Sequence, residues 1–369
     1  MVLQNTPTIS PMNRQAIADR KGGLSSVHVS SAVKEEYAAA ISGVGLLYRS
    51  DAGVIKVSGK DGLDLLNRLS TNKLVGLELG RGASTVLTNN KGRILDLLTV
   101  IHRGNHLLLL TSRQAVRKVM DWIDTYTFLE VVVLEDVTEQ SAVLHVLGPK
   151  SALLLKSLFG TDTSKIRLFS SAEVRIGRIE VTAVRTDSLR ILGFDLIVPA
   201  SSVDDVRNAI FERGNRHGVR AVGAEASEII RIEEGIPVCG KELGERFNPL
   251  EAGLIDSISF SKGCYIGQEV IARLNTYKKV QRHLMGVAID SESLPPGGAK
   301  LKVGKKEAGF VTSSAWSLLL GRPIALAFVK KEMAKAGLGV SVVWNDVEVN
   351  GSLAGLPFYS STAPVSQEA

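Results

Sequence analysis

The residues best suited to chemistry gather in one stretch, 261–273, with the sequence SKGCYIGQEVIAR. It combines a cysteine, a lysine, a tyrosine and two glycines, placed between an apolar strand and a helix expected over residues 269–274. A thiol just before a helix N-terminus and close to a lysine is favoured as the thiolate, its reactive form. We therefore interpret Cys264 as a candidate nucleophile. A strand-to-helix turn with a small buried cysteine fits the same residues, because free cysteines are commonly buried.

The string Lys-Gly-Cys-Tyr-Ile-Gly-Gln-Glu, residues 262–269, resembles the signature of the YgfZ-type branch of the folate-binding, aminomethyltransferase-like superfamily. The glycine-cleavage T-protein is the best-known member of that superfamily. The resemblance extends from about Gly43 to Phe358. It implies a tetrahydrofolate cofactor, or a one-carbon derivative of it, and a role in the assembly or repair of iron–sulfur enzymes.

Within the stretch, the resemblance makes Cys264 the working thiol at the mouth of a folate site. The residues expected near the cofactor are Lys262, Tyr265, Gln268 and Arg273. Arg273 is equally consistent with an exposed arginine on a helix.

A second segment, Arg231-Ile232-Glu233-Glu234-Gly235, ends a helix expected over residues 225–234. It resembles the T-protein segment Arg-Leu-Glu-x-Gly, whose glutamate binds the pterin, and the resemblance gives that role to Glu233. A carboxylate can accept two parallel hydrogen bonds from the amide edge of a folate ring. The alternative is a surface glutamate at a helix C-terminus, where the helix dipole disfavours negative charge.

A third segment, residues 92–97, resembles the T-protein turn Gly-Gly-Ile-x-Asp-Asp, whose second aspartate is catalytic. Asp96 matches the first aspartate, and Leu97 replaces the second. We interpret Asp96 as a solvent-facing residue on a half-exposed strand. Thr111 and Ser112, candidate caps for the next helix, replace a ligand asparagine of the T-protein. T-protein chemistry is therefore not expected from this segment.

Composition excludes several function classes. The chain of 369 residues has a net charge of +6, 44% hydrophobic and 22% charged residues, which is typical of a globular protein of two or three domains. No apolar run reaches the roughly 20 residues that cross a bilayer, and residues 1–23 lack the apolar core of a secretory signal. Two cysteines indicate a reducing compartment and, with scattered histidines, predict no metal site. An aromatic fraction of 5% is too low for stacking on single-stranded RNA.

Apolar periodicity predicts an α+β, T-protein-like fold, with mixed α/β folate-binding domains and a C-terminal antiparallel β-barrel. Helices are expected over residues 32–40, 58–69, 115–123, 150–158, 202–214 and 225–234. Strands are expected over 55–58, 85–88, 94–101, 106–110, 142–147 and 191–198, and in the barrel over 284–289, 300–303, 309–312, 324–329, 340–344 and 347–349. The expected domains are an N-terminal extension (1–40), a first folate-binding domain (41–140 and 222–280), a second α/β domain (141–221), the barrel (281–358) and a tail (359–369).

The resemblance implies a folate-dependent factor for iron–sulfur cluster assembly or repair, with iron–sulfur proteins or assembly factors as partners. One alternative is a glycine-cleavage-type aminomethyltransferase that uses tetrahydrofolate. Another is a non-catalytic folate-binding regulator of tRNA modification. We expect a monomer in the cytoplasm, or else in mitochondria or the plastid stroma, with neither membrane attachment nor direct nucleic-acid binding.

Overall fold

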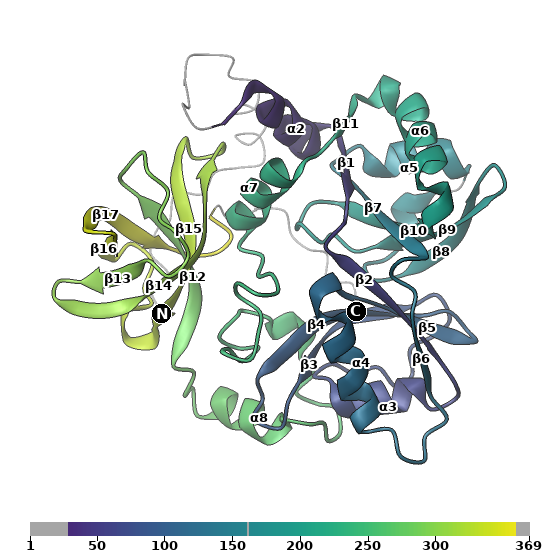
Figure 1. The fold of residues 1–369 in the computed structure, drawn as a ribbon, viewed down its shortest axis with the longest axis horizontal. Helices are drawn as coiled ribbons and strands as arrows, with labels where there is room; N and C mark the ends of the chain where they lie inside the picture. The colour runs from purple at the N-terminus through teal and green to yellow at the C-terminus, as the bar shows by residue number, and fades with distance from the viewer. Residues whose placement is uncertain (1–28, 161, 359–369) are drawn as a thin grey trace.

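Three β-sheets organise the protein, and each has its own apolar core (Figure 1). The computed structural model describes residues 29–160 and 162–358. The expectations for residues 1–23 and for the tail over 359–369 lie outside the described residues. Within the described ranges, no helix is both long and apolar enough to cross a bilayer.

The first sheet has five strands in the order β3-β4-β5-β2-β6. Their bounds are β2 (Ala52–Ser58), β3 (Gly82–Thr88), β4 (Ile94–His102), β5 (His106–Ser112) and β6 (Val133–Asp136). The amphipathic helices α3 (Gly62–Leu69) and α4 (Val116–Thr125) place Leu65, Leu69 and Val119 in the core of this sheet. The predicted hairpin over 94–101 and 106–110 is confirmed as β4 and β5.

The second sheet has six strands in the order β11-β1-β7-β10-β9-β8. Their bounds are β1 (Val44–Tyr48), β7 (Ser141–Leu147), β8 (Ser171–Ile176), β9 (Ile179–Arg185), β10 (Gly193–Pro199) and β11 (Val219–Ala221). Helices α5 (Ser151–Phe159) and α6 (Val203–Gly214) supply apolar side chains to its core. Strand pairing joins residues 44–48 to the sheet of the 141–221 segment, and the predicted domain boundaries remain a prediction.

The C-terminal body is the closed antiparallel barrel that the sequence predicted, with the order β12-β15-β14-β13-β16-β17. Its strands are β12 (Arg282–Ile289), β13 (Lys300–Val303), β14 (Lys306–Ser317), β15 (Arg322–Lys330), β16 (Gly339–Trp344) and β17 (Val347–Ala354). Alternating side chains fill the barrel with small and branched apolar groups.

Three further helices lie between these bodies: α2 (Ser31–Ser42), α7 (Ala224–Glu234) and α8 (Gln268–Thr276). Helix α2 covers residues expected as part of an extension, yet Val33 and Tyr37 belong to a core shared with α7 and the barrel. Helix α7 ends at Gly235, which adopts φ 71° as the predicted helix stop requires. These helices therefore join the three bodies.

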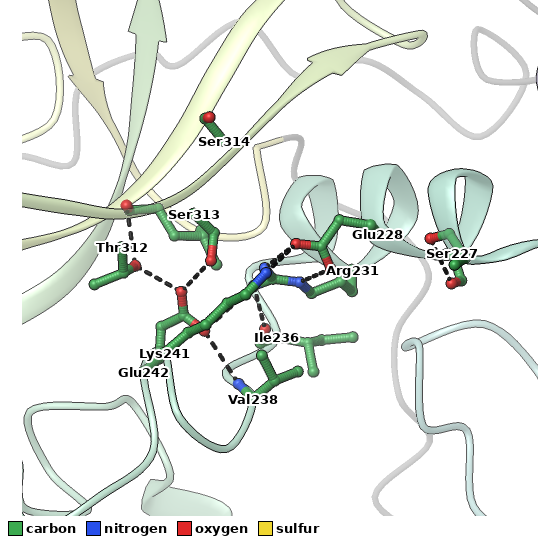
Figure 2. Close-up of polar contacts among 12 residues, drawn as sticks. Ser227, Glu228, Arg231, Ile236, Val238, Lys241, Glu242, Thr312, Ser313 and Ser314 are labelled. Atoms are coloured by element: carbon green, nitrogen blue, oxygen red, sulfur yellow. Dashed lines mark hydrogen bonds and ion pairs between the residues drawn. The ribbon is translucent and has the colours of Figure 1, made fainter. Parts of the chain in front are cut away.

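The segment after α7 is fastened to the barrel by the buried carboxylate of Glu242 (Figure 2). The Oε1 atom of Glu242 accepts hydrogen bonds of 2.6 Å from the hydroxyls of Thr312 and Ser313 on β14. Its Oε2 atom accepts from the Val238 N–H at 3.1 Å and from Arg231 at 3.3 Å. A buried carboxylate is stable only when it is paired and hydrogen-bonded in this way.

Replacing Glu242 with Gln should lower stability by about 3 kcal/mol, because the change leaves the Arg231 charge and two hydroxyls poorly matched in a buried place. The midpoint of thermal unfolding measures this loss. Glu135→Gln is the matched control: its ion pair with Lys56 is solvent-exposed, so it should change stability by less than about 1 kcal/mol. Equal effects of the two variants would contradict a fastening role for Glu242.

Candidate functional site

The predicted nucleophile, Cys264, is exposed on the loop that leads into α8. The backbone on its C-terminal side is anchored to helix α3 and to strand β3 of the first sheet. The Ile266 N–H donates to the Arg68 carbonyl at 2.9 Å, and the Thr88 hydroxyl donates to the Ile266 carbonyl at 2.8 Å. The loop therefore holds the thiol at the surface, and the alternative of a buried cysteine is wrong.

Gly267 lets this loop approach the turn between β3 and β4. It adopts φ 83° as the N-cap of α8. A Cβ atom there would lie 2.7 Å from the Asn89 carbonyl oxygen and 2.9 Å from Gly92 Cα. Only glycine satisfies both the left-handed backbone and this close contact.

The ammonium group of Lys262 is occupied within the protein. Its Nζ donates to the carbonyls of Asn67, Ser70 and Asn72 at 2.5, 2.7 and 2.7 Å, which satisfies all three of its protons. Burial lowers the pKa of Lys262 to about 8. Lys262 therefore satisfies carbonyls at the end of α3, whereas the sequence suggested that it would favour the Cys264 thiolate.

The other residues predicted to contact the cofactor are Tyr265, Gln268 and Arg273. Tyr265 is buried, which raises its pKa to about 12, and its ring lies 4.9 Å from Lys262 Nζ. Gln268 accepts a hydrogen bond of 3.3 Å from the Tyr265 N–H. Arg273 is exposed on α8. Tyr265 and Gln268 thus shape the loop, and the cofactor roles predicted for these residues remain predictions.

Glu233, the predicted pterin contact, is 1% exposed and lies at the junction of α7, α2 and the barrel. Its Oε1 accepts from the Ser317 hydroxyl at 2.6 Å and the Leu319 N–H at 3.1 Å. Its Oε2 accepts from the Tyr37 hydroxyl at 2.6 Å. The alternative of a surface glutamate is wrong, and the carboxylate is bound by donors from both sides of the junction.

Asp96 is fully buried, and the expectation that it faces solvent is wrong. Its carboxylate accepts from the Thr111 hydroxyl at 2.5 Å, the Ser112 N–H at 2.7 Å and the Ser112 hydroxyl at 3.0 Å. These donors compensate the free-energy cost of burying the Asp96 carboxylate. That cost was the reason for expecting the side chain to face solvent. They also correct the capping prediction, because the Ser112 hydroxyl binds Asp96 and caps no helix N–H.

The thiol of the other cysteine, Cys239, lies beside this carboxylate. Burial and the Asp96 charge raise the pKa of the Cys239 thiol, against hydrogen bonds with Ser112 and Gln114. No motif marked Cys239 or Tyr37, since both come close to a carboxylate only in the folded chain.

A cleft of about 620 Å³ lies between the β3–β4 turn and α4. Its lining includes Lys91, Arg93 and Lys118, together with the ring pair of Trp122 and Tyr126, whose centroids are 5.0 Å apart. Pockets of this size hold small ligands, and the lining also includes Glu245, which pairs with Lys118 at 2.7 Å. Nothing in the sequence marked this cleft, because its residues come from three separate segments.

The predicted site residues therefore form separate groups. Figure 1 shows α7, which carries Glu233, and α8, next to Cys264, at opposite ends of the central region. The structure does not bring the predicted thiol into contact with the predicted pterin carboxylate. Asp96 forms a third group, and residues 29–160 and 162–358 contain no cluster of histidine, cysteine and acidic groups that could hold a metal.

Comparison with known proteins identifies the family. The model of the GCVT N-terminal domain matches residues 17–262, and that of the glycine cleavage T-protein C-terminal barrel domain matches residues 282–360. The chain belongs to the glycine cleavage T-protein family. This family uses tetrahydrofolate, as the resemblance implied.

Similar proteins cover nearly the whole chain. An aminomethyltransferase of Caldanaerobacter subterraneus subsp. tengcongensis is 29% identical over 97% of this chain and 96% of its own. An aminomethyltransferase of Geobacillus kaustophilus is 30% identical over 89% of this chain and 91% of its own. The crystal structure of glycine cleavage system aminomethyltransferase T from Bartonella henselae matches with a TM-score of 0.80 at 18% identity, over 95% of this chain and 98% of that one. The T-protein fold is thereby confirmed, while the YgfZ-type branch remains a prediction.

Cys264 should react with iodoacetamide before Cys239 at neutral pH. Its thiol is exposed, whereas Cys239 is half-buried and has a raised pKa. Peptide mass spectrometry after a timed reaction measures both rates. Cys264→Ser should lose the fast phase and Cys239→Ser should retain it. Faster labelling of Cys239 would contradict the assignment of Cys264 as the accessible thiol.

Proposed function

We propose that the chain is a folate-dependent one-carbon transferase, with aminomethyl transfer to tetrahydrofolate as its reaction. The observation that carries this proposal is the match of all three bodies, in one continuous chain, to a family of aminomethyltransferases. Bound tetrahydrofolate would supply the nitrogen atoms that accept the one-carbon group.

Glu233 is the residue proposed to hold the pterin. Its two carboxylate oxygens suit the two adjacent donors of the pterin amide edge. In the described arrangement these oxygens accept from Tyr37, Ser317 and Leu319. Folate binding through Glu233 therefore requires exchange of a protein donor, and we assign that exchange to the Tyr37 hydroxyl on α2.

The second acid of the T-protein turn is replaced by Leu97, and Asp96 is bound by Thr111 and Ser112. Positioned general acid–base groups contribute about 10²–10⁴-fold to rates. Aminomethyl transfer by this chain should therefore be slower than by an enzyme with that carboxylate. In the absence of that carboxylate, this chain would accelerate the reaction by positioning the substrate and by excluding water from it.

A second candidate function is folate-dependent assembly or repair of iron–sulfur enzymes. The exposed thiol of Cys264 favours it, because Lys262, Tyr265 and Gln268 hold the loop that presents this one reactive group. In this candidate, an iron–sulfur protein or an assembly factor docks at the loop. A folate-binding regulator of tRNA modification would share the folate site without requiring the thiol.

Glu233→Gln should weaken tetrahydrofolate binding by about tenfold or more, because a charge-assisted pair worth about 1.5–3 kcal/mol is lost. Tyr37→Phe removes the competing hydroxyl, so its affinity should equal or exceed that of the native chain. Calorimetric titration gives both dissociation constants, and thermal unfolding checks that both variants are folded. Equal affinities for Glu233→Gln and the native chain would place folate elsewhere, with the cleft beside α4 as the next candidate.

Two assays separate the candidate functions. In glycine cleavage reconstituted with the other three components, we expect slow turnover that requires tetrahydrofolate. Folate binding without turnover would contradict aminomethyl transfer. Cells that lack the native protein then decide the role of the thiol: if only Cys264→Ser, and not Cys239→Ser, fails to restore iron–sulfur enzyme activities, the second candidate replaces the first.

A further inference from the structure

A chain of three polar side chains lies on the second sheet, away from all the residues discussed above. His145 on β7 and Asp195 on β10 are directly opposed in the strand register, and both are fully buried. His145 Nδ1 lies 2.7 Å from Asp195 Oδ1. The hydroxyl oxygen of Ser188, in the loop between β9 and β10, lies 3.3 Å from His145 Nε2.

Asp195 is held as the carboxylate. Burial opposes its ionisation, but the Arg49 guanidinium beside it holds the pKa of Asp195 below the usual range. Arg49 Nη1 contacts the second oxygen, Oδ2, at 3.1 Å. An ionised Asp195 fixes the imidazole with Nδ1–H donating to Oδ1, so in neutral His145 the Nε2 lone pair is free to accept a proton.

The neighbouring backbone leaves room for this imidazole. A Cβ atom on Gly193 would lie 2.6 Å from His145 Cε1 and 2.7 Å from Nε2. Any larger residue at position 193 would clash with the ring. Ser188 itself is half-buried, so its hydroxyl lies at the boundary between the buried pair and solvent.

The loop that carries Ser188 is strained and fixed. Asp187 and Arg190 adopt φ 43° and 52°, which is unusual for residues with a Cβ atom. The Asp187 carboxylate is held by the Gly193 N–H at 3.0 Å and by Arg185 at 3.1 Å. Among the described residues, no acceptor binds the N–H groups of Ser188 and Leu189. Two such adjacent N–H groups can stabilise an oxyanion.

We propose that Ser188 is a nucleophile activated by His145 and Asp195, and that it takes the acyl group of a small ester or thioester. The arrangement has the three roles that define a serine acyl-transfer site: a hydroxyl, a base within hydrogen-bond reach, and a carboxylate that orients the base. It is independent of the folate proposal, which uses none of these residues.

The reaction balances with water as the only co-reactant. The Ser188 oxygen attacks the carbonyl carbon while its proton passes to His145 Nε2. The bond from the carbonyl carbon to the alcohol or thiol then breaks, and the leaving group takes that proton. A water molecule, deprotonated by His145, hydrolyses the ester on Ser188, releases a carboxylic acid and restores the hydroxyl. Asp195 stays ionised throughout and stabilises the protonated imidazole.

A fluorophosphonate probe tests this proposal on the full chain, because it modifies serines activated in this way. We expect one adduct per chain, located on Ser188 by peptide mass spectrometry. We also expect the chain to release nitrophenol from p-nitrophenyl acetate, and the fluorophosphonate to inhibit this release. The part of the rate that the fluorophosphonate inhibits should fall at least 100-fold in Ser188→Ala. That variant removes only an oxygen from a half-exposed loop and should fold normally.

Ser201→Ala is the matched control, since this exposed serine lies in the same body and should leave labelling unchanged. Asp195→Asn, if its thermal unfolding shows a folded chain, should slow labelling by about 10²–10⁴-fold because the base loses its orienting charge. The proposal is overturned if the native chain carries no adduct on Ser188. Labelling of a folded Asp195→Asn chain at the native rate would also overturn it.

Discussion

Buried carboxylates along one connecting segment, residues 233–251, hold the three bodies of this protein together. Glu233 binds the last residue of β14 and the turn that follows it, and Glu242 binds two hydroxyls within β14. Glu251 accepts from Arg282 at 3.2 Å and lies 3.5 Å from Arg93, so it joins the first barrel strand to the first sheet. A carboxylate removed from water is destabilising unless its donors are in place. Each of these residues therefore penalises any displacement of the barrel from the rest of the chain.

The connecting segment also meets the barrel through aromatic packing. The rings of Phe247 and Phe328 stack with centroids 3.8 Å apart, and Phe310 lies beside both. These rings would be exposed if the connecting segment moved away. Polar fastening and apolar contact thus reinforce one another: the carboxylates specify the geometry, and the burial of the rings supplies much of the favourable free energy.

The loop around Cys264 is held by contacts within the protein, and these contacts leave the Cys264 thiol accessible. An ammonium bound by three carbonyls, a buried tyrosine and a glycine packed on a neighbouring turn leave the backbone little freedom. A fixed, exposed thiol can meet a second protein without first ordering its own loop, which reduces the entropic cost of association. This loop is separate from Glu233, the residue proposed to bind the pterin.

The sequence alone predicted more of the fold than of the site. Helices over 225–234 and 269–274, the β4–β5 hairpin and the six barrel strands followed from local periodicity and turn residues, which short stretches carry by themselves. The environments of Asp96 and Glu233 did not. Whether a carboxylate faces water depends on donors such as Thr111 or Tyr37, and the Tyr37 partner is distant in the chain.

What the sequence by itself determined is therefore the set of elements, the barrel and the presence of a thiol just before a helix. Only the tertiary structure decided that Lys262 binds carbonyls, that Cys239 lies beside Asp96, and that Ser188, His145 and Asp195 meet on one sheet. The physical reason is the separation along the chain over which each interaction acts. Backbone propensity and apolar periodicity act between residues a few positions apart, whereas the partner of a buried polar group is chosen by strand pairing and packing between segments far apart in the chain.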